Sequence, residues 1–374
     1  MHMKILHIIP ELNKGGAERL VIDICQELQQ REDIEICLLV FRPNNDYKTF
    51  TKDLRIELIP SHVRPSLSGK NQVDVEDLQK FIDTLQPDVI HSHLFETEMV
   101  MSQLRVGNAL RIMHFHDNMH QLEKRGVKTL FSKKRITDFY ERHLILKCWK
   151  KLPKKIAISI ANDSFIYAQR ALPTSTPVYK LLNGISINRF QTKAPKEKVL
   201  ELCMIGSLVE KKAQNLAISV VKNLHEKGLS FHLHLLGDGP NRKALEALSN
   251  ELELTDFIHF HGNVDHPETF LHKAFVYLHT ANYEPLGLVI LEAMAARTPV
   301  VCVDGRGNRD LIEQGKNGFI FQQPDPAQLA HKIIELWEND PLYNSVQSAA
   351  EEFVKDFDIT HYCSRLEELY RSHL

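Results

Sequence analysis

Short apolar runs alternate with helical patterns along the first half of this chain, and the alternation limits the folds it can adopt. The apolar runs are separated by segments with the hydrophobic spacing of a helix, for example residues 75–86. The runs are rich in Ile, Leu and Val and predict buried strands at residues 4–9, 34–41, 56–60, 88–94, 111–116, 155–160 and 178–183. Strands that take turns with helices indicate a parallel sheet with helices on both of its faces.

The same alternation restarts after a polar, lysine-rich stretch at residues 188–198. Strands are predicted here at residues 199–207, 231–239, 257–262, 275–281, 299–304 and 318–322, with helices such as 215–228 and 242–253 between them. A chain of 374 residues, 43% of them hydrophobic, can supply two cores. We therefore predict an α/β protein with two doubly wound, Rossmann-like domains at residues 1–185 and 186–355. For the remaining residues, 356–374, we predict a C-terminal helix that packs back on the first domain.

Charge and cysteine usage exclude several classes of protein. A formal net charge of -2 argues against nucleic acid as the main partner. The six cysteines are scattered, without the spacing of a zinc site, which favours a reducing compartment. No apolar run approaches the ~20 residues of a membrane span. These features predict a cytoplasmic protein without a structural metal.

Two glutamates in the second half stand where the pattern predicts a ligand site. Glu284 lies in a Pro- and Gly-containing loop, and Glu292 lies on the apolar helix that this loop begins. A carboxylate on a buried helix needs hydrogen-bond donors or a positive charge. Glu292 is therefore either a solvated residue or a partner of Arg297, or it accepts hydrogen bonds from a ligand. Gly15 and Gly16 precede a helix in the first half, where free amides favour an anion.

Several motifs in one order carry a resemblance to a known family. The segment from Glu284 to Glu292 has the form E-x7-E, and "GGAE" stands at residues 15–18. Further matching segments are residues 88–93, 181–186, 205–215, 235–240, 260–264 and 307–321. Together they resemble the GT4 family of retaining glycosyltransferases, over nearly the whole chain. The resemblance implies the GT-B fold, in which two Rossmann-like domains face each other across a cleft.

The resemblance also implies roles for individual residues. Glu284 would contact hydroxyls of the donor sugar, and Glu292 would accept hydrogen bonds from the ribose of the nucleotide. Lys212 would neutralise the diphosphate, whereas its neighbour Lys211 reads as a solvated residue. His116 would be the active-site histidine, although one of 20 histidines at a strand end can be purely structural. The donor-binding set is completed by Gly15, Gly16 and Ser207 and by the amides of Leu286, Gly287 and Leu288.

Two positions depart from the family pattern, Ser207 and Asp310, and the second is the milder change because Asp replaces the more usual Glu. Ser207 stands where the family usually has an arginine, so one of two cations expected on the diphosphate is missing. The candidates to compensate are Lys211, Arg306 and Arg309. Gly305 and Gly307 read either as part of the sugar-donor site or as simple turn glycines.

The resemblance implies transfer of a hexose or N-acetylhexosamine, with retention of configuration and without a metal ion or cofactor. The sugar donor would be UDP- or GDP-linked, and the acceptor a saccharide or lipid-linked saccharide of a bacterial surface glycan. A nucleotide-sugar epimerase and a non-catalytic sugar-nucleotide binding protein remain as alternatives. Residues 124–155 hold twelve lysines and arginines against two acids, interleaved with apolar side chains. This stretch reads equally as a solvated helix or as a surface for an anionic membrane, which would make the protein a peripheral membrane enzyme.

Overall fold

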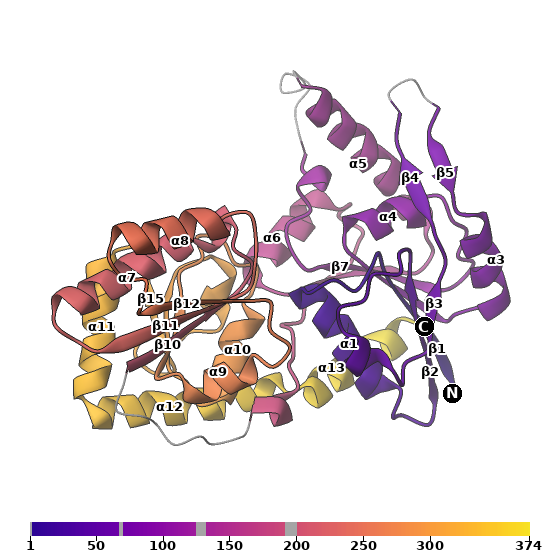
Figure 1. Cartoon of the computed structure of the whole chain (residues 1–374). Coiled ribbons are helices and arrows are strands. Elements are labelled where there is room, and N and C mark those ends of the chain that lie inside the picture. Colours follow the sequence, from indigo (N-terminus) through magenta and orange to yellow (C-terminus); the bar gives the residue numbers. More distant parts are fainter. Residues whose placement is uncertain (1, 67–69, 125–131, 191–199) are drawn as a thin grey trace. The chain divides into compact units, whose positions relative to one another are not determined.

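The computed structural model describes residues 2–66, 70–124, 132–190 and 200–374, which form two compact units (Figure 1). Unit 1 comprises Met1–Gly184 together with Ile359–Leu374, and unit 2 comprises Ile185–Asp358. The lysine-rich stretch predicted between the domains lies largely outside the described residues, because 191–199 are among the gaps.

Unit 1 is built on a parallel sheet with the strand order β3-β2-β1-β6-β7-β8-β9. Its strands are β1 (Met3–Ile9), β2 (Ile34–Val40), β3 (Ile56–Leu58), β6 (Val89–His93), β7 (Leu110–Phe115), β8 (Lys155–Ser159) and β9 (Val178–Lys180). A separate antiparallel hairpin pairs β4 (His62–Arg64) with β5 (Gln72–Asp74). The helices are α1 (Gly16–Leu28), α2 (Lys48–Thr51), α3 (Glu76–Leu85), α4 (Phe95–Met101), α5 (Lys133–Lys151), α6 (Asn162–Ala171) and α13 (Ile359–His373).

Both faces of this sheet are buried, as the apolar runs predict. On β1, Ile5 and Ile9 belong to the same core cluster as side chains of α1 and α13. The alternate residues Leu6 and Ile8 pack with α3 and α4 on the opposite face. The two-residue period of a strand thus supplies each layer of helices with its own core.

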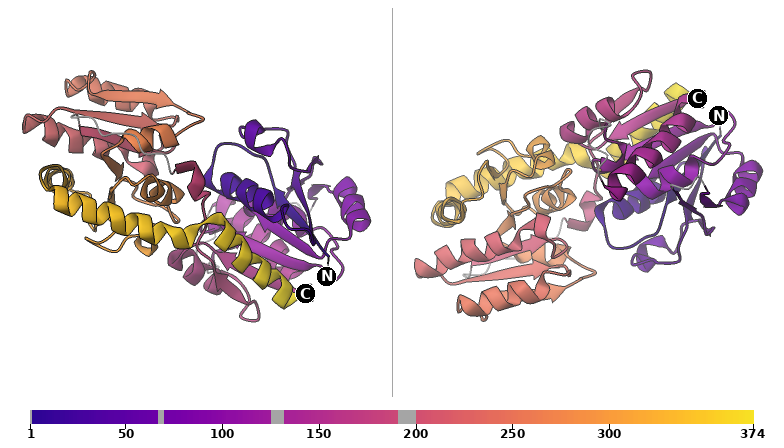
Figure 2. Two further views of the ribbon diagram at one scale, coloured as in Figure 1. Left: turned by 90° about the horizontal axis from the view of Figure 1, so that it is seen from below. Right: turned by 90° about the horizontal axis from the view of Figure 1, so that it is seen from above.

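The last helix, α13, is part of unit 1. Its buried residues Cys363, Leu366 and Tyr370 join the core that contains α1. Glu367 forms an ion pair with Arg31 of unit 1, and Arg371 lies 2.6 Å from the carboxylate of Asp33. Figure 2 shows α13 running along the sheet of unit 1. The C-terminal segment therefore completes a core that the first strands begin.

Unit 2 has a parallel sheet with the order β12-β11-β10-β13-β14-β15. Its strands are β10 (Leu200–Ile205), β11 (Phe231–Leu236), β12 (Ile258–Gly262), β13 (Val276–His279), β14 (Val300–Val303) and β15 (Phe319–Phe321). The helices are α7 (Gln214–Glu226), α8 (Arg242–Glu251), α9 (Glu268–Lys273), α10 (Leu288–Ala295), α11 (Pro326–Glu338) and α12 (Asp340–Val354), with short 3-10 turns η4 (Glu210–Lys212) and η5 (Gly307–Asp310).

Every apolar run that predicts a strand contains one, and both sheets are parallel. The hairpin β4–β5 has no such signal, because β5 is exposed along its length and lacks an apolar run. Among the described residues, no helix is long and apolar enough to cross a membrane.

Candidate active site

The loops that carry the predicted sugar-donor residues meet at the topological switch point of unit 2. Strand β10 pairs with β11 on one side and with β13 on the other. The chain turns in opposite directions from these strands, and open α/β sheets bind ligands at the carboxyl ends of the strands at such a point. Ser207 follows β10 and Glu284 follows β13, so the fold brings the two loops to the same edge of the sheet.

Lys212 points to Glu284 because its turn is tied to the end of β13. The hydroxyl of Thr280 lies 3.1 Å from the carbonyl oxygen of Lys212, and the amide of Asn282 donates to the carbonyl of Lys211 at 2.9 Å. The Lys212 side chain is 17% exposed, and its ammonium lies 2.5 Å from Oε2 of Glu284. Lys211 is exposed instead. The two adjacent lysines therefore have different surroundings, as the sequence motif predicts.

The Glu284 carboxylate is buried and stays ionised. Burial by itself raises the pKa of this carboxyl, but His279 and the Lys212 ammonium outweigh burial and lower the pKa to about 2. The backbone of Glu284 is fixed as well, because its amide donates to Gly305 at 2.8 Å and its carbonyl accepts from Gly307 at 3.0 Å. The site therefore holds a fixed negative charge beside a fixed positive one.

His279 is a site residue that the sequence reasoning missed. It ends strand β13, is 1% exposed, and places Nε2 3.2 Å from Oε2 of Glu284, although not at a hydrogen-bond angle. Its Nδ1 lies 3.1 Å from the hydroxyl of the buried Tyr277. A chain of polar groups thus runs from Tyr277 through His279 to Glu284 and ends at Lys212. The signal in the sequence was a histidine at a strand end five residues before Glu284.

Gly305 and Gly307 are more than turn glycines. A Cβ atom on Gly307 would lie 1.8 Å from the carbonyl oxygen of Pro285, and a Cβ on Gly305 would lie 2.9 Å from the Cβ of Glu284. The buried side chain of Asn308 bridges the loop, accepting from the Gly305 amide and donating to the carbonyl of Val303, both at 2.8 Å. This close packing holds the Glu284 loop in place.

Helix α10 begins directly after that loop. Gly287 caps it with φ of 96°, a left-handed conformation that favours glycine, and Leu286 is buried. The first amides of the helix, beginning at Leu288, have no partner within the helix. Glu292 is half-buried one turn further on. Arg297, the alternative partner of Glu292, lies 3.1 Å from the carboxylate of Glu351.

The Ser207 position has no cation of its own. Ser207 is exposed, and its carbonyl accepts from the Gln214 side chain at 2.9 Å. Arg309 is engaged by Asp304 at 2.5 Å. Arg306 and Lys211 are exposed and lie 5.9 Å and 6.0 Å from the centre of the same aromatic ring, that of Tyr283. Arg309 is therefore paired within its own loop, whereas Arg306 and Lys211 lie at the surface beside Tyr283.

The predicted residues of unit 1 lie at the carboxyl end of its sheet. Gly15 precedes α1, and both its amide and its carbonyl lie 3.1 Å from the hydroxyl of Tyr47, while Gly16 is exposed. His116 follows β7 and is 7% exposed. Burial lowers the pKa of its imidazole to about 3, so it is neutral at physiological pH. Its Nε2 lies 2.8 Å from Nδ1 of His93.

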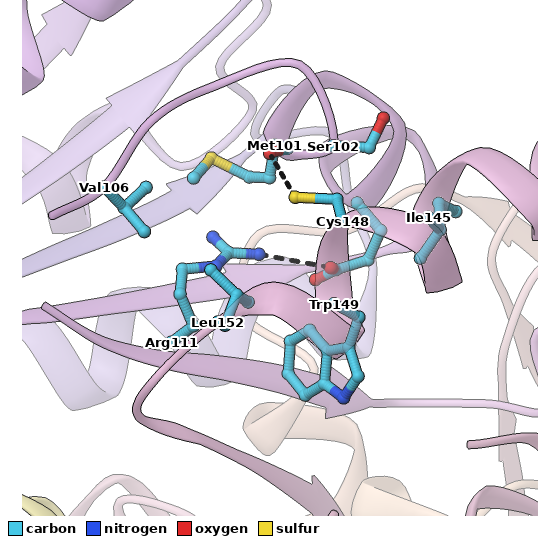
Figure 3. Close-up of a pocket in the computed structure, with 9 residues that line it drawn as sticks. Met101, Ser102, Val106, Arg111, Ile145, Cys148, Trp149 and Leu152 are labelled. Atoms are coloured by element: carbon cyan, nitrogen blue, oxygen red, sulfur yellow. Dashed lines mark hydrogen bonds and ion pairs between the residues drawn. The ribbon is translucent and has the colours of Figure 1, made fainter. Parts of the chain in front are cut away.

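Unit 1 holds two further groupings of polar side chains. His7, His91 and His93, and likewise His93, His114 and His116, lie close enough together to hold a metal ion. A small pocket under α5, with room for about one water molecule, contains a buried ion pair between Arg111 and Glu98 at 3.2 Å (Figure 3). Figure 3 shows Arg111 beside Val106, Cys148 and Leu152, in surroundings that fit a structural role.

Sequence comparisons decide the family. The family described as "Glycosyl transferases group 1" matches residues 186–353, and "Glycosyltransferase Family 4" matches residues 14–158. The chain is a glycosyltransferase of the type that these two family models together describe. EpsD of Bacillus subtilis, named a glycosyltransferase, is 23% identical over 332 residues, which cover 83% of each chain. The lipopolysaccharide core biosynthesis glycosyltransferase LpsE of Rhizobium meliloti is 30% identical over 158 residues, covering 42% of this glycosyltransferase and 45% of LpsE.

Solved structures agree on the fold. HepE of Anabaena, crystallised with UDP and glucose, superposes on this glycosyltransferase with a TM-score of 0.78 at 20% identity, covering 99% of this chain and 100% of HepE. TarM superposes with a TM-score of 0.78 at 16% identity and covers 99% of both chains. The expected GT-B architecture of two Rossmann-like domains is confirmed by these similarities.

Proposed function

We propose that this glycosyltransferase moves a hexose or N-acetylhexosamine from a nucleoside diphosphate, with retention of configuration and without a divalent cation. The observation that carries the proposal is the buried Lys212–Glu284–His279 arrangement beside the start of α10. It places one cation, one carboxylate and the first amides of a helix at the switch point of a nucleotide-binding type of sheet.

The reaction places different demands on these groups. Breaking the bond between the anomeric carbon and the phosphate leaves negative charge on the diphosphate, which Lys212 and the amides of Leu286, Gly287 and Leu288 stabilise. Glu284 accepts hydrogen bonds from hydroxyls of the donor sugar, since its depressed pKa keeps it an acceptor. Glu292 binds the ribose hydroxyls. The family resemblance assigns Gly15 and Gly16 to the phosphates and the neutral His116 to the reacting sugar.

The substrates are proposed from the relatives. Bound UDP in HepE supports a UDP-linked sugar donor, and a GDP-linked sugar donor is the alternative to test. The relatives include LpsE and a poly(ribitol-phosphate) α-N-acetylglucosaminyltransferase of Staphylococcus aureus, which is 27% identical over 176 residues. These names support a saccharide or lipid-linked saccharide acceptor in the synthesis of a cell-surface glycan.

We also propose that α5 brings the enzyme to an anionic membrane at the inner face of the cell. Trp149 and Ile145 face the core, but Ile136 and Phe139 are 38% and 45% exposed. Lys133, Lys134, Arg135, Lys147, Lys150 and Lys151 are exposed on the same helix. Apolar side chains flanked by lysines suit an anionic bilayer surface. Residues 125–131 of the basic stretch lie outside the described residues.

Thermal unfolding with a panel of nucleotides tests the sugar-donor site. A diphosphate at 100 times its dissociation constant adds about 2.7 kcal/mol, which raises the melting temperature of a unit of this size by roughly 5–10 °C. UDP or GDP should give this shift with EDTA present, and the corresponding nucleosides should give much less. A shift that EDTA abolishes, or none with any diphosphate, would refute the metal-independent site.

Product analysis tests the reaction itself. With the stabilising sugar nucleotide and a saccharide acceptor, proton NMR should show a product with the anomeric configuration of the sugar donor. An inverted linkage would refute retention. Conversion of the sugar nucleotide to its epimer would instead identify an epimerase.

A further inference from the structure

Five buried histidines share one face of the sheet in unit 1. His7 lies on β1, His91 and His93 on β6, His114 on β7, and His116 directly after β7. His7 pairs in register with His91, and His93 pairs with His114. Residues two apart on a strand point to the same side, so the H-x-H patterns at 91–93 and 114–116 put all of these rings together. Each is at most 7% exposed.

The rings and one tyrosine form a continuous hydrogen-bonded chain. The hydroxyl of Tyr370, on α13, lies between His91 and His7. The chain begins at His116, whose Nε2 lies 2.8 Å from Nδ1 of His93, and continues from Nε2 of His93 to Nδ1 of His7 at 2.9 Å. Nε2 of His7 lies 3.5 Å from the Tyr370 hydroxyl, which lies 2.6 Å from Nδ1 of His91. The chain ends at His114, whose Nδ1 lies 3.0 Å from Nε2 of His91.

The ring geometry favours hydrogen bonds over a metal ion at this cluster. A metal lies in the plane of each imidazole that binds it, so its histidine ligands do not stack face to face. Here His114 and His116 stack with centroids 4.1 Å apart and 22° between planes, and His91 and His93 stack at 4.3 Å and 24°. The nitrogen–nitrogen separations of 2.8–3.0 Å are hydrogen-bond distances.

Neutral imidazoles make the chain directional. Burial lowers the pKa of all five histidines far below the ordinary range, so each carries one N–H donor and one lone-pair acceptor. A ring that accepts on one nitrogen must therefore donate from the other. If one hydrogen bond is assigned a direction, every other bond in the chain takes the same direction.

Tyr370 supplies that direction. Its oxygen lies 2.6 Å from His91 Nδ1, which is in the range of an O–H donor and shorter than N–H···O bonds. The hydroxyl thus donates to His91, and its lone pair accepts from Nε2–H of His7 at the longer distance of 3.5 Å. Following the chain both ways places the proton on Nε2 of every histidine. Nδ1 of His116 and Nε2 of His114 are the chain ends, and neither has a hydrogen-bond partner among the described residues.

We propose that Tyr370 is a positioning residue that sets all five histidines to the Nε2–H tautomer and so leaves the buried Nδ1 of His116, which has no partner among the described residues, with a free lone pair. A group with this lone pair binds a ligand that donates, such as a hydroxyl, and disfavours a phosphate oxygen, which only accepts. The catalytic consequence rests on the proposed role of His116 at the reacting sugar; the tautomer assignment does not.

Long-range proton–nitrogen NMR on protein with 15N-labelled histidine tests the assignment directly. In the wild-type protein all five rings should show the neutral Nε2–H pattern, with signals assigned by single His→Gln replacements. A neutral Nδ1–H pattern at His116, or a mixture of tautomers among the five rings, would overturn the proposal. Stoichiometric zinc binding that is lost in His93→Ala would overturn it as well.

Tyr370→Phe removes only the hydroxyl and should yield both tautomers at His7 and His91. Tyr362→Phe is the matched control, because Tyr362 is buried on the same helix and its hydroxyl has no hydrogen-bond partner among the described residues. It should leave the spectrum unchanged. An unchanged spectrum in Tyr370→Phe, or equal changes in both variants, would refute the role of Tyr370.

Kinetics then separate this proposal from the role of His116. Tyr370→Phe should lower kcat by about tenfold, with the dissociation constant of the nucleotide within about twofold of wild type. Tyr362→Phe should retain wild-type kcat. If the tautomers change but kcat does not, the chain is as proposed and the placement of His116 at the reacting sugar is wrong.

Discussion

Replacing Lys212 by methionine should slow transfer far more than replacing Lys211. The methionine keeps most of the buried volume and removes the charge that lies 2.5 Å from Glu284. In the proposed reaction this charge faces a diphosphate whose negative charge grows as the bond to the sugar breaks. The loss should therefore fall on kcat more than on the affinity for the sugar donor.

The size of the effect follows from Coulomb's law. Two unit charges about 4 Å apart interact by about 4 kcal/mol at an effective dielectric constant near 20. If the leaving oxygen gains about half a charge in the transition state, Lys212 contributes about 2 kcal/mol, or roughly 30-fold in rate. Losing one preorganised group in an enclosed site costs about 10²–10³-fold. A fall in kcat of about 10²-fold is expected for Lys212→Met. Lys211→Met, at an exposed position, should stay within about threefold.

The assay must separate action on the diphosphate from support of Glu284. Release of nucleoside diphosphate is measured for Lys212→Met in the wild-type background and again in a Glu284→Gln background. If Lys212 acts on the diphosphate, the loss of the lysine should lower kcat by the same large factor in both backgrounds. If Lys212 only balances the buried carboxylate, the factor should be large in the wild-type background and small in the Glu284→Gln background, which would refute the reasoning. Equal losses for the two lysine variants would refute it too.

Three other outcomes are expected. The folded pKa of Glu284 is about 2, below its ordinary value of 4.5, so its stabilisation is present above about pH 4.5 and is lost as pH falls toward 2. Melting curves from pH 6 to pH 3 should show wild type losing more stability than Glu284→Gln, by at most about 2 kcal/mol over this range. Glu98→Ala leaves the charge of the buried Arg111 without its ion-pair partner, so the free energy of unfolding measured with urea should fall by about 3–5 kcal/mol. Adding Arg111→Met should recover much of that loss. Sedimentation with anionic vesicles should show binding that fades with salt and weakens in Ile136→Ser/Phe139→Ser, whereas equal binding to neutral vesicles would contradict the membrane surface.

The sequence predicted the sheets well because both faces of each sheet are buried. A strand such as β14, buried at every residue, reads as an unbroken apolar run, and the alternation with helices then implies parallel pairing. The hairpin β4–β5 gave no such signal, since Val73 is 44% exposed between polar neighbours.

The candidate site was predictable where a motif spans it and not where contacts cross the chain. Lys212 and Glu284 came from motif segments 72 residues apart, but their direct contact depends on Thr280 holding the lysine turn. His279 carries no motif, and the apolar pattern predicts it only as part of the strand at residues 275–281. Tyr370 lies 279 residues from His91, and no local pattern connects the two.

The chain leaves unit 1 after Gly184 and returns to it at Ile359, and beside these points the amide of Ile185 donates to the carbonyl of Phe357 at 2.9 Å. On the ribosome, domains generally fold as units in the order in which they emerge. Unit 1 cannot follow that order, because the core around α1 lacks α13 until residues 359–373 have left the exit tunnel. Unit 2 is continuous and can fold first. The nascent first half must therefore wait with part of its core open, and during synthesis this is where chaperones should bind longest.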